Sequence, residues 1–180
     1  MPALSLPIIL IGPMGSGKTT VGRHLAQRLE ANYVDTDDLF VAEHGHIGQF
    51  FTTHGETAFR DNEQQVIAQT LARDDLGVIS LGGGAIIRLA NREIIRERGY
   101  VVFLDVSESK ALNRLGDASD RPVLAGDPAG QWSRIRADRL EHFTQSAHQV
   151  VDTTGLDVDA VATKIVQGYQ SFCQGIRPQL

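Results

Sequence analysis

The sequence has little of several features that would restrict its function. A single cysteine, Cys173, excludes a disulfide bridge or a paired-cysteine metal site within the chain and suits a reducing compartment. The apolar stretch at residues 6–11 is far shorter than the ~20 residues of a membrane span and lacks the basic flank of a targeting signal. Dense runs of Lys and Arg are also missing, and the formal net charge is −5, whereas a nucleic-acid binder usually carries a basic patch. We therefore expect a cytoplasmic protein that binds neither nucleic acid nor membrane.

What is present is the composition of one globular domain. Of the 180 residues, 42% are hydrophobic and 22% are charged, which is ordinary for a protein with a packed core. This length fits one compact α/β domain and leaves little room for a second. We therefore predict a single domain over residues 1–180.

Short apolar segments alternate with segments of helical periodicity along the chain. Strands are expected at residues 6–11, 33–35, 77–81, 100–105 and 150–152. Helices are expected at residues 19–29, 39–44, 56–72, 91–98, 107–115, 131–143 and 157–170. This alternation predicts an α/β fold with a parallel sheet flanked by helices on both faces. Residues 116–130 are rich in Gly, Asp and Pro with little periodicity, and they are the candidate for a mobile lid.

Residues 12–19 read GPMGSGKT and match the phosphate-loop pattern G-x-x-x-x-G-K-[ST] at every fixed position. The motif lies between a predicted strand and a predicted helix, as the pattern requires. Its backbone N–H groups can surround phosphate oxygens at the positive end of the helix. Lys18 would then reach the β- and γ-phosphates, and the Thr19 hydroxyl would bind Mg²⁺. The predicted nucleotide contacts in this segment are Gly15, Ser16, Gly17, Lys18, Thr19 and Thr20.

Two acidic patterns are ambiguous by themselves. Asp35 and Asp37 follow the second predicted strand, and the carboxyl ends of parallel strands face the ligand crevice. Asp is equally common at a turn that begins a helix. Arg60 and Glu63 are three residues apart on a predicted helix, so they share a face and can pair. Such pairs lie on the solvated surface in most proteins.

Two further patterns have both a functional and an ordinary interpretation. The triple glycine at residues 82–84 permits close backbone approach to a ligand or unusual dihedral angles, or simply makes a tight turn. Arg121 in the lid segment could close over a transferring phosphoryl group and neutralise its charge. Arg139 lies on the helix that follows the lid. Either arginine could also be an ordinary surface residue.

Taken in order, these motifs resemble the shikimate kinase family over nearly the whole chain. After the phosphate loop come DTD at residues 35–37, FxxxGExxFRxxE at 51–63, LGGGA at 81–85 and RPVLAG at 121–126, at about the family's spacing. The resemblance implies the three-layer architecture of the P-loop nucleoside monophosphate kinases with a mobile lid. It also implies a monomeric, Mg²⁺-dependent enzyme of aromatic amino-acid biosynthesis that transfers the γ-phosphate of ATP to the 3-hydroxyl of shikimate.

The resemblance also implies roles for individual residues. The acceptor-binding set would be Asp37, Arg60, Gly83 and Arg139, much of it within a segment of about residues 36–63. The two arginines would hold the carboxylate, and Asp37 would hold ring hydroxyls, as a general base or as a positioning group.

On the nucleotide side, the resemblance places Arg121 on ATP as the lid arginine and Arg114 near the adenine. Asp35 would order the Mg²⁺ shell through water, and Glu63 would position Arg60. The residues implied in catalysis are Lys18, Asp37 and Arg121.

The chain departs from the family pattern at two places. The run after Arg139 reads LEHF where the family usually has a proline, and the segment at residues 45–51 is about one residue short. Two rival functions remain: another small-metabolite kinase of the same architecture, such as a gluconate kinase, and a nucleotide-dependent binding module without an acceptor. The second leaves the DTD, FRxxE and GGG motifs unexplained.

Overall fold

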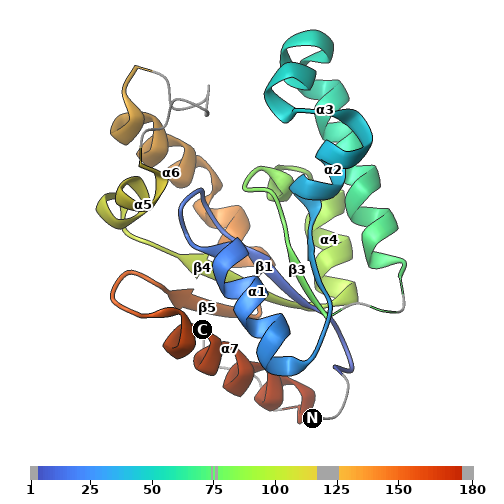
Figure 1. The fold of residues 1–180 in the computed structure, drawn as a ribbon, viewed down its shortest axis with the longest axis vertical. Helices are drawn as coiled ribbons and strands as arrows, with labels where there is room; N and C mark the ends of the chain where they lie inside the picture. Colours follow the sequence, from blue (N-terminus) through green and yellow to red (C-terminus); the bar gives the residue numbers. More distant parts are fainter. Residues whose placement is uncertain (1–3, 74, 76, 117–125, 176–180) are drawn as a thin grey trace.

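The protein contains one five-stranded sheet with the strand order β2-β3-β1-β4-β5 (Figure 1). The computed structural model describes residues 4–73, 75, 77–116 and 126–175. Each neighbouring pair of strands is parallel, as the alternation of segments predicts. The strands are β1 (Ile8–Ile11), β2 (Tyr33–Asp35), β3 (Val78–Ser80), β4 (Tyr100–Asp105) and β5 (Gln149–Asp152).

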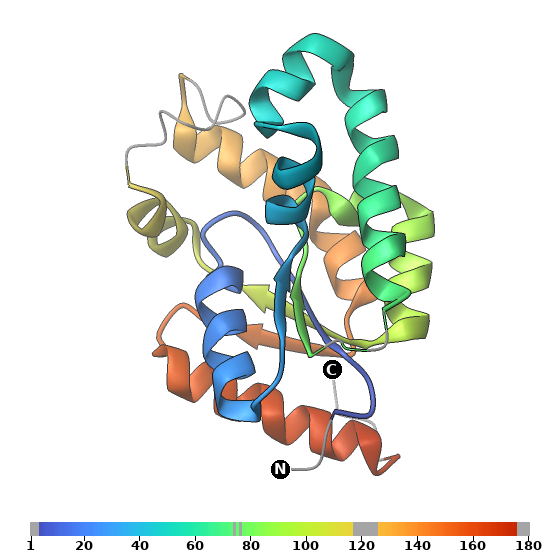
Figure 2. The ribbon, with the colours of Figure 1, turned by 45° about the vertical axis from the view of Figure 1, so that its right-hand side comes forward.

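Helices cover both faces of this sheet, so the predicted three-layer architecture is confirmed (Figure 2). Helices α1 and α7 pack on one face, and α3, α4 and α6 pack on the other. None of the helices in the described ranges has the length and apolarity to cross a membrane. The helices are α1 (Lys18–Leu29), α2 (Thr36–His44), α3 (Ile47–Leu71), α4 (Leu89–Arg98), α5 (Glu108–Leu115), α6 (Pro128–Ser146) and α7 (Val158–Cys173), with a short 3-10 helix η1 (Ala85–Ile87).

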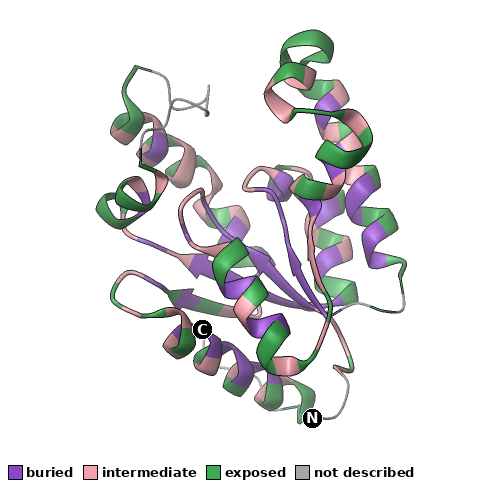
Figure 3. Ribbon diagram, in the orientation of Figure 1, coloured by how far each residue is buried: buried purple, intermediate pink, exposed green. Residues whose placement is uncertain are grey.

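The central strand β1 supplies side chains to two separate cores. Ile8 and Leu10 pack with α1 and α7, whereas Ile9 and Ile11 pack with α3, α4 and α6. All four residues are at most 1% exposed. Because successive strand residues point to opposite faces, a strand covered on both sides needs an unbroken apolar run. Figure 3 shows this burial at the centre of the sheet and exposure on the outer helix faces.

Helix α6 begins earlier than the sequence predicts. Asp127 is its N-cap and accepts a hydrogen bond from the Gly130 N–H at 3.0 Å, and Pro128 occupies the first turn. An aspartate followed by proline is a favourable helix start. The predicted lid at residues 116–130 was therefore too long, because residues 128–130 are helical. Residues 117–125, including Arg121, lie outside the described residues.

The segment before the FRxxE motif is also more helical than predicted. Helix α2 begins at Thr36, and α3 already begins at Ile47 and is kinked at Gly55, which has a φ of 82°. Aromatic packing supports this extension, since the rings of Phe50 and Phe51 lie 5.2 and 4.8 Å from those of Phe40 and Phe59. Sequence periodicity missed the extension because two short helical pieces at different angles do not share one apolar face.

The residue just before β5 is a histidine whose surroundings favour its neutral form. The His148 ring stacks on Tyr100, and its Nδ1 accepts a hydrogen bond from the Val101 N–H at 3.0 Å. Burial, together with the positive charge of Arg96, lowers the pKa of His148. Protonation would remove the acceptor of this hydrogen bond.

This environment predicts a pH-dependent stability. Because the folded-state pKa lies below the ordinary value of about 6.5, the contribution of His148 is present above that pH and is lost as the pH falls through the folded-state pKa. We expect the Tm of the wild-type protein to fall more than that of His148→Gln as the pH is lowered from neutral to about 5. Thermal unfolding monitored by circular dichroism measures this. His54→Gln, at an exposed site, should retain the wild-type pH dependence, and parallel curves for all three proteins would contradict the assignment.

Candidate active site

Two adjoining cavities lie at the carboxyl edge of the sheet. The phosphate-loop cavity, of about 610 Å³, is lined by residues 14–21 and by parts of α5 and α7. The arginine cavity, of about 530 Å³, is lined by Arg60, Arg139 and the glycines at 82–84. Met14, Asp37 and Gly83 line both. A group bound in one cavity is therefore next to a group bound in the other.

The phosphate loop connects β1 to α1 with the backbone that its pattern predicts. Gly15 and Gly17 have positive φ angles of 76° and 95°, which favour glycine. The Lys18 ammonium donates hydrogen bonds to the carbonyls of Gly12 and Pro13 at 2.8 and 3.0 Å. Its side chain thus crosses its own loop, where a phosphate would be held. All of the predicted nucleotide contacts from Gly15 to Thr20 line this cavity, as does Arg114.

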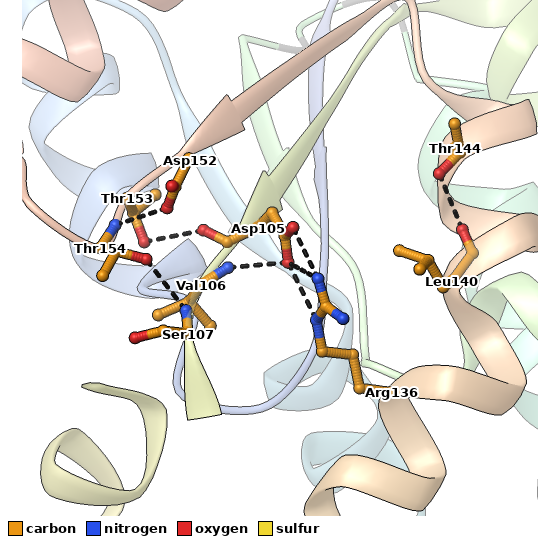
Figure 4. A network of polar contacts seen from close by, with 9 residues as sticks. All are labelled: Asp105, Val106, Ser107, Arg136, Leu140, Thr144, Asp152, Thr153 and Thr154. Atoms are coloured by element: carbon orange, nitrogen blue, oxygen red, sulfur yellow. Dashed lines mark hydrogen bonds and ion pairs between the residues drawn. The ribbon is translucent and has the colours of Figure 1, made fainter. Parts of the chain in front are cut away.

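The ends of β4 and β5 fix the far side of this loop. Arg114 donates hydrogen bonds to the Gly15 carbonyl at 3.1 Å and to the Thr153 hydroxyl at 3.2 Å. The Thr153 hydroxyl lies 3.0 Å from the Asp105 carbonyl (Figure 4). It also lies 3.2 Å from the Ser16 carbonyl. The Asp105 carboxylate in turn pairs with Arg136 of α6 at 2.7 Å. These contacts restrict the loop from several directions.

Asp35 is the N-cap of a helix and also lines the phosphate-loop cavity. Its Oδ1 accepts a hydrogen bond from the Asp37 N–H at 3.1 Å, so it is the N-cap of α2. Its Oδ2 accepts hydrogen bonds from the hydroxyls of Thr19 at 3.2 Å and Tyr33 at 3.1 Å. Burial raises the pKa of Tyr33 to about 12, so this phenol stays protonated and remains a donor at neutral pH. Two oxygen groups suited to a hard cation, Thr19 and Asp35, are thus held together beside the phosphate loop.

In the triple glycine, Gly82 and Gly84 lie close against charged side chains, whereas a Cβ atom at Gly83 would make only ordinary contacts. None of Gly82, Gly83 and Gly84 has a positive φ. A Cβ atom at Gly82 would lie 2.5 Å from an Asp37 carboxylate oxygen, and one at Gly84 would lie 2.5 Å from an Arg60 nitrogen. The Gly83 carbonyl accepts a hydrogen bond from Arg139 at 3.1 Å. The loop backbone therefore lies directly against the charged groups of the arginine cavity.

Arg60 and Glu63 form a buried ion pair on α3, as their spacing predicts. Arg60 Nη1 lies 2.6 Å from Glu63 Oε2, and Glu63 is only 5% exposed. Burial raises the pKa of Glu63, and the opposite charge of Arg60 acts against this rise. Within the described part of the chain, the buried Nε of Arg60 has no hydrogen-bond partner, and it lies 3.6 Å from a carboxylate oxygen of Glu56.

Arg139 completes the positive wall of this cavity. Burial, and then the positive charge of Arg60, lower the pKa of its guanidinium. Across the described ranges Arg139 makes no ion pair shorter than 4.0 Å. A negative ligand group between the two arginines would relieve their repulsion and occupy donors that the protein leaves available. The departure from the family pattern after Arg139 does not remove this residue from the cavity.

Sequence reasoning missed several lining residues. Met14 and Ile135 line the arginine cavity as apolar wall residues, and His46 lines it from the N-terminus of α3. Phe51 and Phe59 belong to the FxxxGExxFRxxE motif but were not singled out, although both line this cavity. Apolar residues carry no chemical signal in a sequence, because core positions have the same composition.

Comparison with known proteins agrees with this geometry. The family model described as "Shikimate kinase" matches residues 14–170. A shikimate kinase of Symbiobacterium thermophilum is 39% identical over 167 residues, covering 91% of this chain and 95% of the relative. The structure of a shikimate kinase from Acinetobacter baumannii, in complex with shikimate, has a TM-score of 0.88 at 35% identity and covers 94% of this chain and 96% of that one.

The rival function, a gluconate kinase, is represented by a more distantly similar structure. A gluconokinase from Sinorhizobium meliloti, with a TM-score of 0.60 at 16% identity over 97% of both chains, shares the fold alone. The matched span and the identity to curated relatives both confirm the resemblance seen in the motifs: the chain belongs to the shikimate kinase family.

Proposed function

We propose that the protein transfers the γ-phosphate of ATP to the 3-hydroxyl of shikimate, giving shikimate 3-phosphate and ADP. The observation that carries this proposal is the pair of adjoining cavities that share Met14, Asp37 and Gly83. One cavity has a phosphate loop, and the other has two arginines suited to a carboxylate. Shikimate has one carboxylate and three hydroxyls, and a relative of this chain was solved in complex with it. We also propose that the enzyme acts as a monomer in the cytoplasm.

On the donor side, residues 15–20 and Arg114 would hold the nucleotide. Lys18 would leave the carbonyls of Gly12 and Pro13 and pair with the β- and γ-phosphates, since a charged partner is stronger than a neutral carbonyl. Arg121 is proposed as the lid arginine, and it lies outside the described residues. Because phosphoryl transfer needs little covalent chemistry from the protein, these residues would act by placing charge and by orientation.

The residues beside the phosphate loop fit Mg²⁺. This ion uses oxygen ligands and usually keeps several waters, with one or two carboxylates and the substrate phosphates. Thr19 and Asp35, with their oxygens 3.2 Å apart, match that demand. The nucleotide and waters would supply the remaining oxygen ligands of this ion. When bound, it would neutralise charge on the phosphates.

On the acceptor side, Arg60 and Arg139 would hold the carboxylate and Gly83 would border the ring. Glu63 would keep the Arg60 fork in place through their 2.6 Å contact. Asp37 lies between the cavities, so its carboxylate would accept a hydrogen bond from the 3-hydroxyl. As the bond between the 3-oxygen and the γ-phosphorus forms and the bond to the ADP oxygen breaks, Asp37 would accept the proton released by the hydroxyl.

The substrate class is tested by an acceptor panel. ADP release in a coupled assay should rise strongly with shikimate and stay at the no-acceptor rate with gluconate. Faster turnover of gluconate would indicate the rival metabolite kinase. ATP binding without turnover of any acceptor would indicate a nucleotide-dependent binding module.

Asp37→Asn tests the position of this residue on the acceptor side. Asn keeps the shape but loses the charge and the basicity, so kcat should fall by about 10²–10⁴-fold while ATP affinity changes little. Steady-state kinetics and ATP calorimetry measure the two effects. Asp38→Asn is the matched control, because Asp38 is exposed in the same first turn of α2. If ATP affinity falls more than turnover does, Asp37 acts on the nucleotide.

Arg60→Lys tests recognition of the carboxylate. Lysine keeps the positive charge but loses the planar fork, so KM for shikimate should rise about ten- to hundredfold with little change in KM for ATP. A shikimate analogue with a neutral amide in place of the carboxylate should lose much less affinity between the wild type and Arg60→Lys. Arg88→Lys is the control, because Arg88 makes a similar 2.6 Å pair with Asp61 outside both cavities. Equal losses for acid and amide would make Arg60 structural.

A further inference from the structure

One face of α6 contacts the ends of three different strands. Trp132 donates from its indole Nε1 to the Met14 carbonyl in the loop after β1, at 3.0 Å. One turn later, Arg136 pairs with Asp105 at the end of β4 (Figure 4). Arg139 follows after three residues and donates to the Gly83 carbonyl after β3 at 3.1 Å. Residues three and four apart share a helix face, so a single rigid element touches the walls of both cavities.

Trp132 lies behind Met14, one of the residues that line both cavities. Its side chain is buried, at 2% exposure, in a cluster with Val106 and Ala111. Met14 and Ile135 pack against this cluster. Met14 lines both cavities, and Ile135 lines the arginine cavity. A change in the position of the indole would therefore reach side chains on both sides of the site.

The indole hydrogen bond sets the direction of one peptide group in the phosphate loop. A trans peptide is planar, so the Met14 carbonyl and the Gly15 N–H point in opposite directions. With the carbonyl held by Trp132, the Gly15 N–H is turned away from the indole. Gly15 has a positive φ of 76° and lines the phosphate-loop cavity. Glycine permits other backbone conformations at little cost, so an external partner is needed to keep this peptide in one orientation.

We propose that Trp132 is a positioning residue that couples the nucleotide and acceptor sites. Through the Met14 carbonyl, Trp132 would fix the orientation of the Gly15 N–H toward a bound nucleotide. Through α6, it would link this orientation to the position of Arg139 in the arginine cavity. A carboxylate on Arg139 fixes α6, which strengthens the hydrogen bond to the phosphate loop. By linkage, bound nucleotide raises the affinity for the acceptor by the same factor. This proposal rests on the proposed function, since it takes ATP and shikimate as the two ligands.

The test measures the coupling factor directly. Calorimetry gives the Kd of a non-hydrolysable ATP analogue with and without saturating shikimate, and the ratio in the wild type should be at least about fivefold. Trp132→Phe keeps an aromatic ring and removes the N–H. One neutral hydrogen bond is equivalent to about a two- to tenfold change in an equilibrium constant, so the ratio in this variant should fall below about twofold. Shikimate affinity without nucleotide should be nearly unchanged.

A matched control separates coupling from general loosening of the cluster. Leu112 is half-buried against the same cluster, lines neither cavity, and has an aliphatic side chain that cannot make a hydrogen bond to the phosphate loop. Leu112→Ala should lower the Tm and keep the wild-type ratio. The proposal is overturned if the Kd ratio falls in Leu112→Ala as much as in Trp132→Phe. It is also overturned if Trp132→Phe retains the wild-type ratio.

A measurement on the wild type covers the case in which Trp132→Phe does not fold. Trp132 is the single tryptophan of the chain, so its emission reports on this contact. The emission should change with the ATP analogue, and the midpoint should move to a lower concentration when shikimate is present. An unmoved midpoint overturns the coupling and leaves the proposed function standing. Failure of the wild type to bind shikimate at all overturns the proposed function and this proposal with it.

Discussion

The burial of β1 between β3 and β4 is the constraint on which the site depends. Its four residues pack on both faces of the sheet and pair with both neighbouring strands. In a parallel sheet the loops that follow such strands leave from the same edge. The phosphate loop, the glycine loop at residues 82–84 and the end of β4 therefore meet there. The start of α2 joins them because β2 pairs with β3 in register, with Asp35 opposite Ser80.

Close backbone approach makes the acceptor side possible. Arg60, Glu63 and Asp37 converge on the glycine loop, and a methyl group at residue 82 or 84 would collide with their charged atoms. Burying such charges is costly unless they are paired. The Arg60–Glu63 contact of 2.6 Å supplies one pairing. Arg139 donates to a neutral carbonyl and not to a carboxylate. The cavity therefore keeps a positive charge that a carboxylate ligand could pair with.

Helix α6 lines the arginine cavity and is hydrogen-bonded to Met14, a residue that lines both cavities. A kinase that relies on orientation must hold donor and acceptor at a defined separation. Contacts from one helix to the loops after β1 and β3 and to the end of β4 provide a rigid reference for that separation. The Asp105–Arg136 pair has two nitrogens on the carboxylate, a geometry that fixes direction as well as distance.

The sequence alone determined what depends on local pattern. The phosphate loop, the alternation of strands and helices, and the Arg60–Glu63 pairing all follow from spacing within about one turn or one strand. Local pattern also led to errors, since the start of α6 at Pro128 and the helical turns at 47–54 depend on capping and aromatic packing. Only the tertiary structure decided which side chains meet across the site. Trp132 and Met14 are 118 residues apart, and Arg139 and Gly83 are 56 apart. Contacts at such separations arise from the sheet order and from helix packing, and no periodicity in the chain encodes them.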